Sequence, residues 1–301
     1  MLLEIGIGDA YGRPFEFNTP EFITKNNDII GYKHRDNEVI LDGIGRYTDD
    51  TQMSLAIAEH MISEFPGTQI RYAHHFVNAY HRDPRNGYSK RIKKALSESR
   101  VNFPFELIIK ANPTGFSSNG SVMRTIPLGL RSNPKEIIYN CIVHTSVTHG
   151  SIEATNATIA IALTAHYLYH IIETVKGDLY THYASWMKAQ MGHEFFEILD
   201  SYKEEDGTLQ CDAKSTAALS IKLAFGFKGI KSASDLLKLA IDIGGDVDSS
   251  AAIGLGLYSL RPDANMNLPK ALYDNLENDK YGRDYLIEID KNLFKQFPKI
   301  V

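Results

Sequence analysis

Apolar residues along this chain recur mostly at helical spacing. Met53, Ile57 and Met61 lie four residues apart within the stretch from Asp50 to Phe65, which predicts a helix there. Residues 151–175 are apolar on most sides and predict a long, largely buried helix. Proline suits a first helical turn, so Pro134 predicts the start of another helix. The same spacing predicts further helices at 213–227, 234–243 and 249–260.

Strand-like alternation is scarce, and only residues 28–41 suggest a short extended piece. No linker, repeat or low-complexity block interrupts the helical pattern. We therefore expect an all-α fold in which residues 1–301 form a single compact multi-helix domain.

Composition is that of a soluble globular protein, with 43% hydrophobic and 23% charged residues. The formal net charge of −5 gives no overall positive field for nucleic acid or an anionic membrane. Two cysteines, Cys141 and Cys211, are too few for a disulfide framework. The first residues lack a signal-peptide pattern, and no apolar run reaches membrane-spanning length. We expect a cytoplasmic protein that binds neither membrane nor nucleic acid.

An acidic cluster, "RYTDDTQ" at 46–52, precedes the first predicted helix. Asp49 followed three residues later by Gln52 fits a capping box, and carboxylates favour a helix N-terminus. For this cluster alone, capping is the simpler interpretation.

A second cluster, "GGDVDSSAA" at 244–252, precedes the last of these predicted helices. Gly244 and Gly245 can end one helix in a left-handed conformation, and a following Asp or Ser can cap the next. Here too, capping is the simpler interpretation for the cluster alone.

Taken together, the two clusters favour metal binding over capping. Capping uses one side chain per helix, whereas each cluster holds two carboxylates and at least one hydroxyl. Grouped like charges are costly unless a cation neutralises them. Oxygen ligands without cysteine or histidine favour Mg²⁺, Mn²⁺ or Ca²⁺ over zinc. We expect both loops, each at a helix N-terminus, to converge on the same ions.

Five motifs in order along the chain resemble those of the ADP-ribosylglycohydrolase family. They are GDAYGRPFEF (8–17), YTDDTQM (47–53), SNGSVMRTIPLGL (118–130), THG (148–150) and GGDVDSSAAIGLGL (244–257). The resemblance implies an all-helical fold that binds two divalent ions, usually Mg²⁺ or Mn²⁺. It also implies hydrolysis of the glycosidic bond that joins ADP-ribose to a protein side chain or a small-molecule acceptor.

The resemblance further implies which residues bind the metal ions. Where the family usually reads G-G-D-T-D-T, this chain has Val247 and Ser249 in place of the two threonines. Serine keeps the oxygen ligand, so we expect metal binding to persist, whereas Val247 loses a hydroxyl. The implied metal ligands are Thr48, Asp49, Asp50, Asp246, Asp248 and Ser249.

Catalytic and substrate-binding residues also follow from the resemblance. Composition alone would leave Glu16 an ordinary solvated carboxylate, but its motif position implies a functional glutamate beside the metals. We expect Glu16, in an N-terminal loop, and Asp49 to be catalytic. The small-residue loop at 116–122 is either a plain turn or a cradle for a diphosphate. The implied substrate-binding residues are Phe116, as a partner for adenine, with Ser118, Asn119, Gly120, Ser121 and His149.

Several alternatives stay open at this point. Arg124 is either a phosphate contact or part of a structural ion pair. Two-metal sites also hydrolyse phosphoesters, so a metal-dependent phosphohydrolase of nucleotide-like substrates is one alternative, and a catalytically silent ADP-ribose-binding protein is another. The intact T-D-D and D-x-D pairs argue against a silent protein. We expect a monomer whose substrate carries ADP-ribose on arginine, serine, a nucleobase or a small molecule.

Overall fold

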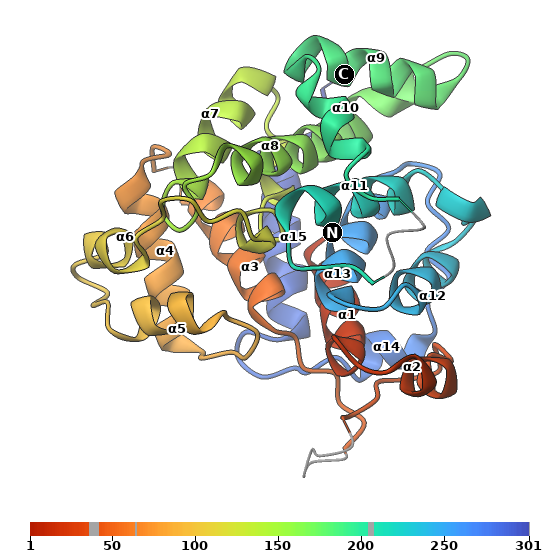
Figure 1. The fold of residues 1–301 in the computed structure, drawn as a ribbon, viewed down its shortest axis with the longest axis horizontal. Helices are drawn as coiled ribbons and strands as arrows, with labels where there is room; N and C mark the ends of the chain where they lie inside the picture. Colours follow the sequence, from red (N-terminus) through yellow and green to blue (C-terminus); the bar gives the residue numbers. More distant parts are fainter. Residues whose placement is uncertain (36–41, 64, 204–207, 301) are drawn as a thin grey trace.

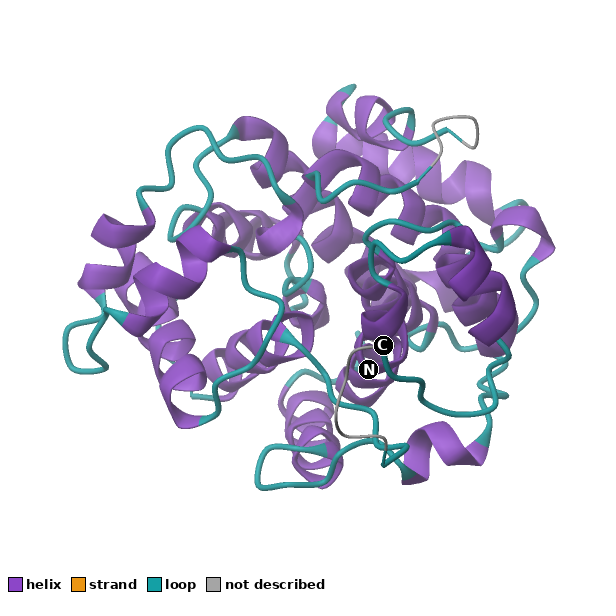
Figure 2. Ribbon diagram, turned by 60° about the horizontal axis from the view of Figure 1, so that its bottom comes forward, coloured by secondary structure: helices purple, strands orange, loops and turns teal. Residues whose placement is uncertain are grey.

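The chain folds into helices joined by loops, in a computed structural model that describes residues 1–35, 42–63, 65–203 and 208–300 (Figure 1). These residues contain no β-strand (Figure 2). Extended pairing within them is limited to isolated bridges between Gly45 and Leu276, Ser118 and Asp212, and Leu209 and Gly245. The predicted all-α class is confirmed.

The α-helices, in chain order, are α1 (Leu2–Gly12), α2 (Pro20–Asn26), α3 (Asp49–Ile62), α4 (Gln69–Arg82), α5 (Lys90–Ser97), α6 (Phe105–Ala111), α7 (Pro134–Thr145), α8 (Ile152–His166), α9 (Leu179–Met191), α10 (Glu194–Leu199), α11 (Ala213–Ala224), α12 (Ala233–Asp242), α13 (Val247–Tyr258), α14 (Lys270–Asp274) and α15 (Arg283–Gln296). Short 3₁₀ segments lie at Arg13–Phe15, Asn119–Ser121, Ile126–Leu130, Ile172–Thr174 and Phe227–Gly229.

Most of the predicted helices occur within a few residues of their expected bounds. The exception is the stretch predicted at 151–175, in which the α-helix ends at His166. A π-helical turn at Tyr167–Ile171 and a 3₁₀ turn continue it. The extended piece predicted at 28–41 is wrong for residues 28–35, which have no partner strand, and residues 36–41 lie outside the described part.

Helix α1, which the periodicity did not predict, packs against α13, α3 and α15 near the centre of the molecule (Figure 1). Its apolar side chains Leu2, Ile5 and Tyr11 are fully buried. A Cβ atom on Gly8 would lie 2.5 Å from the carbonyl oxygen of Ala251, and one on Gly12 would overlap the Cα atom of Asp248. The glycines that weaken this segment as a helix are thus required for its contact with α13.

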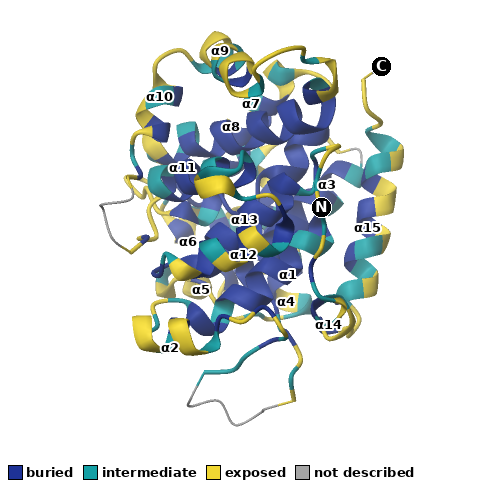
Figure 3. Cartoon of the chain, turned by 90° about the vertical axis from the view of Figure 1, so that its right-hand side faces the viewer, coloured by how far each residue is buried: buried dark blue, intermediate teal, exposed yellow. Residues whose placement is uncertain are grey.

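Burial is greatest in the middle of the bundle. Every residue of α13 is buried, whereas α2 and the outer side of α15 carry exposed residues (Figure 3). In the described part of the chain, no helix combines the length and the hydrophobicity needed to cross a membrane.

One buried side chain, His60 of α3, lacks polar partners. Both of its ring nitrogens are buried without a hydrogen bond among the described residues. Its ring packs against that of Tyr72, with 4.2 Å between the ring centroids. Burial, assisted by the positive charges of Arg131 and Arg71, lowers the pKa of His60 to about 4. His60 is therefore neutral in the folded protein at neutral pH.

His60 should make the folded state sensitive to acid. Its pKa is about 4 when folded and 6.5 when unfolded, so the unfolded chain takes up the proton first as the pH falls. The free energy of unfolding therefore falls between pH 6.5 and pH 4, by about 1–2 kcal/mol at pH 5 for this residue. His60→Leu should lose less stability than the parent between pH 7.5 and pH 5.0 in urea titrations. An unchanged pH dependence in the variant would contradict this role.

Candidate active site

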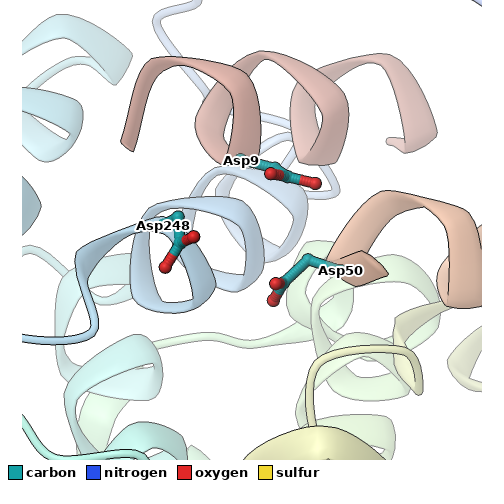
Figure 4. Close-up of side chains that lie close together, drawn as sticks. All are labelled: Asp9, Asp50 and Asp248. Carbon is teal, nitrogen blue, oxygen red and sulfur yellow. The ribbon is translucent and has the colours of Figure 1, made fainter. Parts of the chain in front are cut away.

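Packing of α1 against α13 places Asp9 beside Asp248, and the start of α3 brings Asp50 to the same point. Figure 4 shows the three carboxylates projecting from three helices toward a common space. One oxygen of each lies within 4.8 Å of the others. The convergence predicted for the two acidic clusters is observed, but it includes Asp9, a residue that was absent from the predicted set.

Asp9 also holds the first acidic cluster in place. Its carboxylate accepts hydrogen bonds from the N–H groups of Thr48 (2.9 Å) and Thr51 (3.0 Å). It accepts two more from their hydroxyls, at 2.9 Å and 2.6 Å. Thr48 is the N-cap residue of α3, yet its side chain makes no capping bond, and Asp49 lies within the helix. The capping interpretation is therefore wrong for this cluster.

A second group of carboxylates joins the first through Asp248. Oxygens of Glu16, Asp246 and Asp248 lie within 4.8 Å of one another. The Asn119 side-chain amide donates to Asp246 at 2.5 Å. Asp246 stands at the N-cap of α13 without a side-chain capping bond, so capping is wrong here as well. The preceding Gly244 and Gly245 adopt the left-handed conformation predicted for them, with φ of 77° and 89°.

Glu16 lies in the short connection between α1 and α2, in the N-terminal region where a loop was expected. It follows the 3₁₀ turn Arg13–Phe15 that continues directly from α1. Its carboxylate forms an ion pair with Arg35 at 3.0 Å. Burial and the charge of Asp246 raise the pKa of Glu16, and Arg35 opposes this rise.

Negative charge is concentrated in this site. Burial raises the pKa values of Asp49, Asp50 and Asp248 well above the usual range, and the neighbouring carboxylates raise them further. Such a group is stable in ionised form only when cations or donors offset the repulsion.

The residues present fit a divalent cation. Oδ1 of Asp50 is buried with no hydrogen-bond partner among the described residues, so a strong acceptor there lacks a donor. The side-chain atoms that cluster here are carboxylate oxygens, and these are ligands that suit Mg²⁺, Mn²⁺ and Ca²⁺. The arrangement can therefore hold hard divalent ions.

A cavity of about 210 Å³ opens onto this acidic group. Asp49, Asp50 and Ser249 line its acidic end, together with Glu16, Asp246 and Asp248. Apolar side chains from α3 to α6 and from the segment after Ser121 form another wall: Met53, Phe76, Ile92, Leu96, Leu107 and Met123. The cavity thus joins a charged end to an apolar wall.

The loop predicted to bind substrate lines the cavity only in part. Ser118, Asn119, Gly120 and His149 line it, and a hydrogen bond of 3.0 Å joins Ser118 Oγ to His149 Nε2. His149 Nδ1 is 2.8 Å from the Thr148 hydroxyl, and burial and nearby arginines lower the pKa of His149 to about 3. His149 is therefore a neutral imidazole fixed on both sides.

Three predicted site residues lie outside the cavity lining. The Ser121 hydroxyl is buried and accepts a hydrogen bond from Thr158 at 3.0 Å. The Phe116 ring is partly exposed beneath the Arg91 guanidinium, 3.7 Å from its centroid. The Thr48 hydroxyl donates to Asp9.

Arg124 borders the cavity without an acidic partner. It is buried and donates hydrogen bonds to the His144 carbonyl (3.0 Å) and to the Thr148 hydroxyl (2.8 Å). No carboxylate in the described ranges forms an ion pair with it, so the structural ion pair, one of the two alternatives for Arg124, is not observed there. Hydrogen bonds and the face of Phe76, 4.3 Å away, hold it instead.

Besides Asp9, the sequence did not single out Gly87 or Tyr88. A side chain on Gly87, whose φ is 102°, would overlap Oδ1 of Asp49. The Tyr88 hydroxyl donates to Gln52 at 2.6 Å and fixes the start of α3. Among these residues, only Asp9 could have been found from the sequence. It lies between Gly8 and Gly12, and glycines four residues apart permit close contact between helices.

Comparisons with known proteins show which family this chain resembles. The family model described as ADP-ribosylglycohydrolase matches residues 2–299. ADP-ribosylhydrolase ARH3 of Xenopus tropicalis is 28% identical over 180 residues, which are 55% of this chain and 48% of that protein. ADP-ribosylarginine hydrolase Tri1 of Pseudomonas putida is 28% identical over 171 residues, which are 55% and 44% of the two chains. The matches thus span about half the length of these relatives.

A solved structure, titled ADP-ribosylglycohydrolase-related protein complex, shares the fold. Its TM-score is 0.69 at 18% identity, and the match covers 98% of this chain and 95% of that one. The likeness extends over the whole helical arrangement.

Divalent ions should stabilise the folded protein. EDTA should lower the melting temperature, and Mn²⁺ or Mg²⁺ should restore it. An ion that binds only the folded state raises the free energy of unfolding by about 2.7 kcal/mol at a concentration of 100 times its Kd. The expected restoration is roughly 3–8 °C. Asp50→Asn should lose most of this increment and melt higher than the parent in EDTA, because one repelling charge is gone.

Asp200→Asn, which alters an exposed carboxylate outside the cavity, is the matched control and should keep the full increment. A parent protein whose melting temperature ignores both EDTA and added ions would exclude a metal site here.

Proposed function

Because the chain belongs to the ADP-ribosylglycohydrolase family, we propose that it hydrolyses the glycosidic bond between ADP-ribose and an acceptor, using two divalent ions, Mg²⁺ or Mn²⁺. The observation that carries the proposal is the pair of carboxylate groups sharing Asp248 at the acidic end of the cavity. Two groups that share one ligand suit two neighbouring ions.

Asp49, Asp50, Asp246, Asp248 and Ser249 would hold the ions, with Thr48 beside them. We add Asp9 to this set, since its carboxylate lies in the first group and also orients Thr48 and Thr51. Bound divalent ions supply positive charge that can orient ribose hydroxyls and lower the pKa of water. Asn119 contributes by fixing Asp246.

Glu16 is the residue that we propose moves the proton. Cleavage breaks the bond between C1 of the distal ribose and the acceptor atom, and positive charge builds on the sugar. Water adds to C1, and its proton must pass to a base while the acceptor leaves with a proton. Glu16 lines the cavity within the second carboxylate group and is half-buried, so it is placed to accept that proton. Asp49, buried at the same end, is the other proposed catalytic residue.

ADP-ribose would contact the loop formed by Ser118, Asn119 and Gly120, together with His149. The neutral His149 ring packs closely on Gly120, where a Cβ atom would lie 2.9 Å from its Cε1, so the absence of a side chain on Gly120 lets the ring lie against the loop. Phe116 and Ser121 would support this loop from outside the cavity. The acceptor would be an arginine or serine side chain of a protein, a nucleobase or a small molecule.

Product analysis tests the reaction type. With Mg²⁺ or Mn²⁺, peptides carrying ADP-ribose on arginine or on serine should yield free ADP-ribose. AMP or inorganic phosphate as the product would identify a phosphohydrolase instead. Binding of ADP-ribose without any product would identify a silent binding protein.

Replacing Glu16 by Gln should slow turnover by about 10²–10⁴-fold, the usual contribution of general acid–base assistance. The change keeps the side-chain volume and removes the proton acceptor. Affinity for free ADP-ribose should change much less, because the proposed diphosphate contacts lie on the loop at 118–120. Steady-state rates and calorimetric ADP-ribose binding measure the two effects.

The matched control is Glu21→Gln, an exposed glutamate on α2, which should turn over like the parent. Parent-like turnover in Glu16→Gln would leave an aspartate of the acidic end as the base.

A further inference from the structure

The segment that contains α5 and α6 is basic, although the protein as a whole is acidic. Residues 89–111, here called the basic hairpin, hold six Lys and Arg residues and two Glu residues, for a net charge of +4. The whole chain has a net charge of −5, so the other 278 residues carry −9. Local potential, rather than net charge, decides what docks at a surface.

Half of these cations are engaged inside the hairpin or beneath it. Arg100 forms an ion pair with Glu106, and Lys110 donates to the Glu98 carbonyl. Arg91 donates to the carbonyls of Ala111 and Thr148. These three side chains therefore have structural roles.

The other three cations are Lys90, Lys93 and Lys94, all exposed. None of them forms an ion pair with a carboxylate in the described part of the chain. They lie at i, i+3 and i+4 on α5, where like charges repel one another. Lys90 and Lys93 also lie in the first turn, where the helix dipole disfavours cations, whereas Lys94 lies in the last turn. The helix keeps this arrangement at a cost in stability, which a bound anion would relieve.

These lysines flank the cavity from outside. Ser89, Ile92 and Leu96 of the same stretch line the cavity, and the lysines occupy other faces of α5. Helices α4, α5 and α6 together form one end of the molecule (Figure 1). A ligand in the cavity would meet Ile92 and Leu96 of α5, and the three lysines belong to the same two-turn helix without lining the cavity.

We propose that Lys90, Lys93 and Lys94 dock an acidic peptide segment next to the ADP-ribosylated residue of a protein substrate. This inference rests on the proposed function, and it adds the charge of the partner. Three lysines on about one helical turn match a few neighbouring carboxylates. A protein that binds DNA through about 6–10 phosphate contacts uses a larger surface than three lysines provide. The acidic peptide is therefore the better fit.

The test compares a triple variant with a matched one. Lys90→Gln/Lys93→Gln/Lys94→Gln removes the docking charges. Lys188→Gln/Lys291→Gln/Lys295→Gln removes three exposed lysines from α9 and α15, which contribute nothing to the cavity lining. Both variants are assayed on three substrates that share one linkage. The first is a small ADP-ribosyl amino acid, the second is an acidic peptide with Asp and Glu around the modified residue, and the third is a neutral peptide with Ser and Gly there. We expect kcat/KM on the acidic peptide to fall about 3- to 30-fold in 50 mM salt, only in the first variant, and the loss to vanish in 0.5 M salt.

Equal losses on all three substrates would overturn the proposal, because the lysines would then act on ADP-ribose itself. No loss on the acidic peptide would overturn it too, as would an equal loss in the matched variant. Tighter competition by a single-stranded oligonucleotide than by the acidic peptide would assign the surface to nucleic acid.

If the protein is not a hydrolase, the parent releases no ADP-ribose from any substrate. The peptides then stay intact, and fluorescence anisotropy measures their dissociation constants for the parent and both variants. A selective weakening of the acidic peptide in the first variant supports the docking surface, and its absence overturns it.

Discussion

The structure depends on the close contact between α1 and α13. Gly8 and Gly12 let the two helix backbones approach to distances that any side chain would forbid. That approach sets Asp9 opposite Asp248, and Asp9 in turn fixes Thr48 and Thr51 at the start of α3. Packing of α1 on α13 and the hydrogen bonds of Asp9 thus hold three helix segments in one geometry. The acidic group is rigid because its supports lie in the core.

This rigidity gathers charges that would otherwise separate. Burial and mutual repulsion both raise the free energy of the ionised carboxylates, as the raised pKa values of Asp49, Asp50 and Asp248 show. In the proposed metal site, these charges would lower the stability of the fold without cations and would contribute to it with cations bound. Function and stability would then be coupled through the ions, while the apolar layers elsewhere in the bundle hold the scaffold.

The net charge of the whole chain differs in sign from the charge of the surface formed by α5 and α6. The net charge of −5 combines a strongly acidic site with a basic hairpin, part of which lines the cavity. A sequence-wide average suggests that anionic partners are disfavoured, yet α5 carries exposed lysines that form no ion pair within the described part of the chain. The electrostatic character that a partner meets depends on which helix faces it.

By itself, the sequence determined the all-α class, most helix positions, the left-handed glycines 244 and 245, and the meeting of the two acidic clusters. These follow from local periodicity and from residue chemistry, which short stretches carry within themselves. Tertiary structure decided the rest. It made residues 8–12 part of a helix and brought in Asp9, because a glycine-rich segment gains from packing what it lacks in helix propensity. It also left Ser121 and Phe116 outside the cavity lining and gave Arg124 hydrogen bonds in place of an ion pair, since each of these outcomes depends on a neighbour distant in sequence.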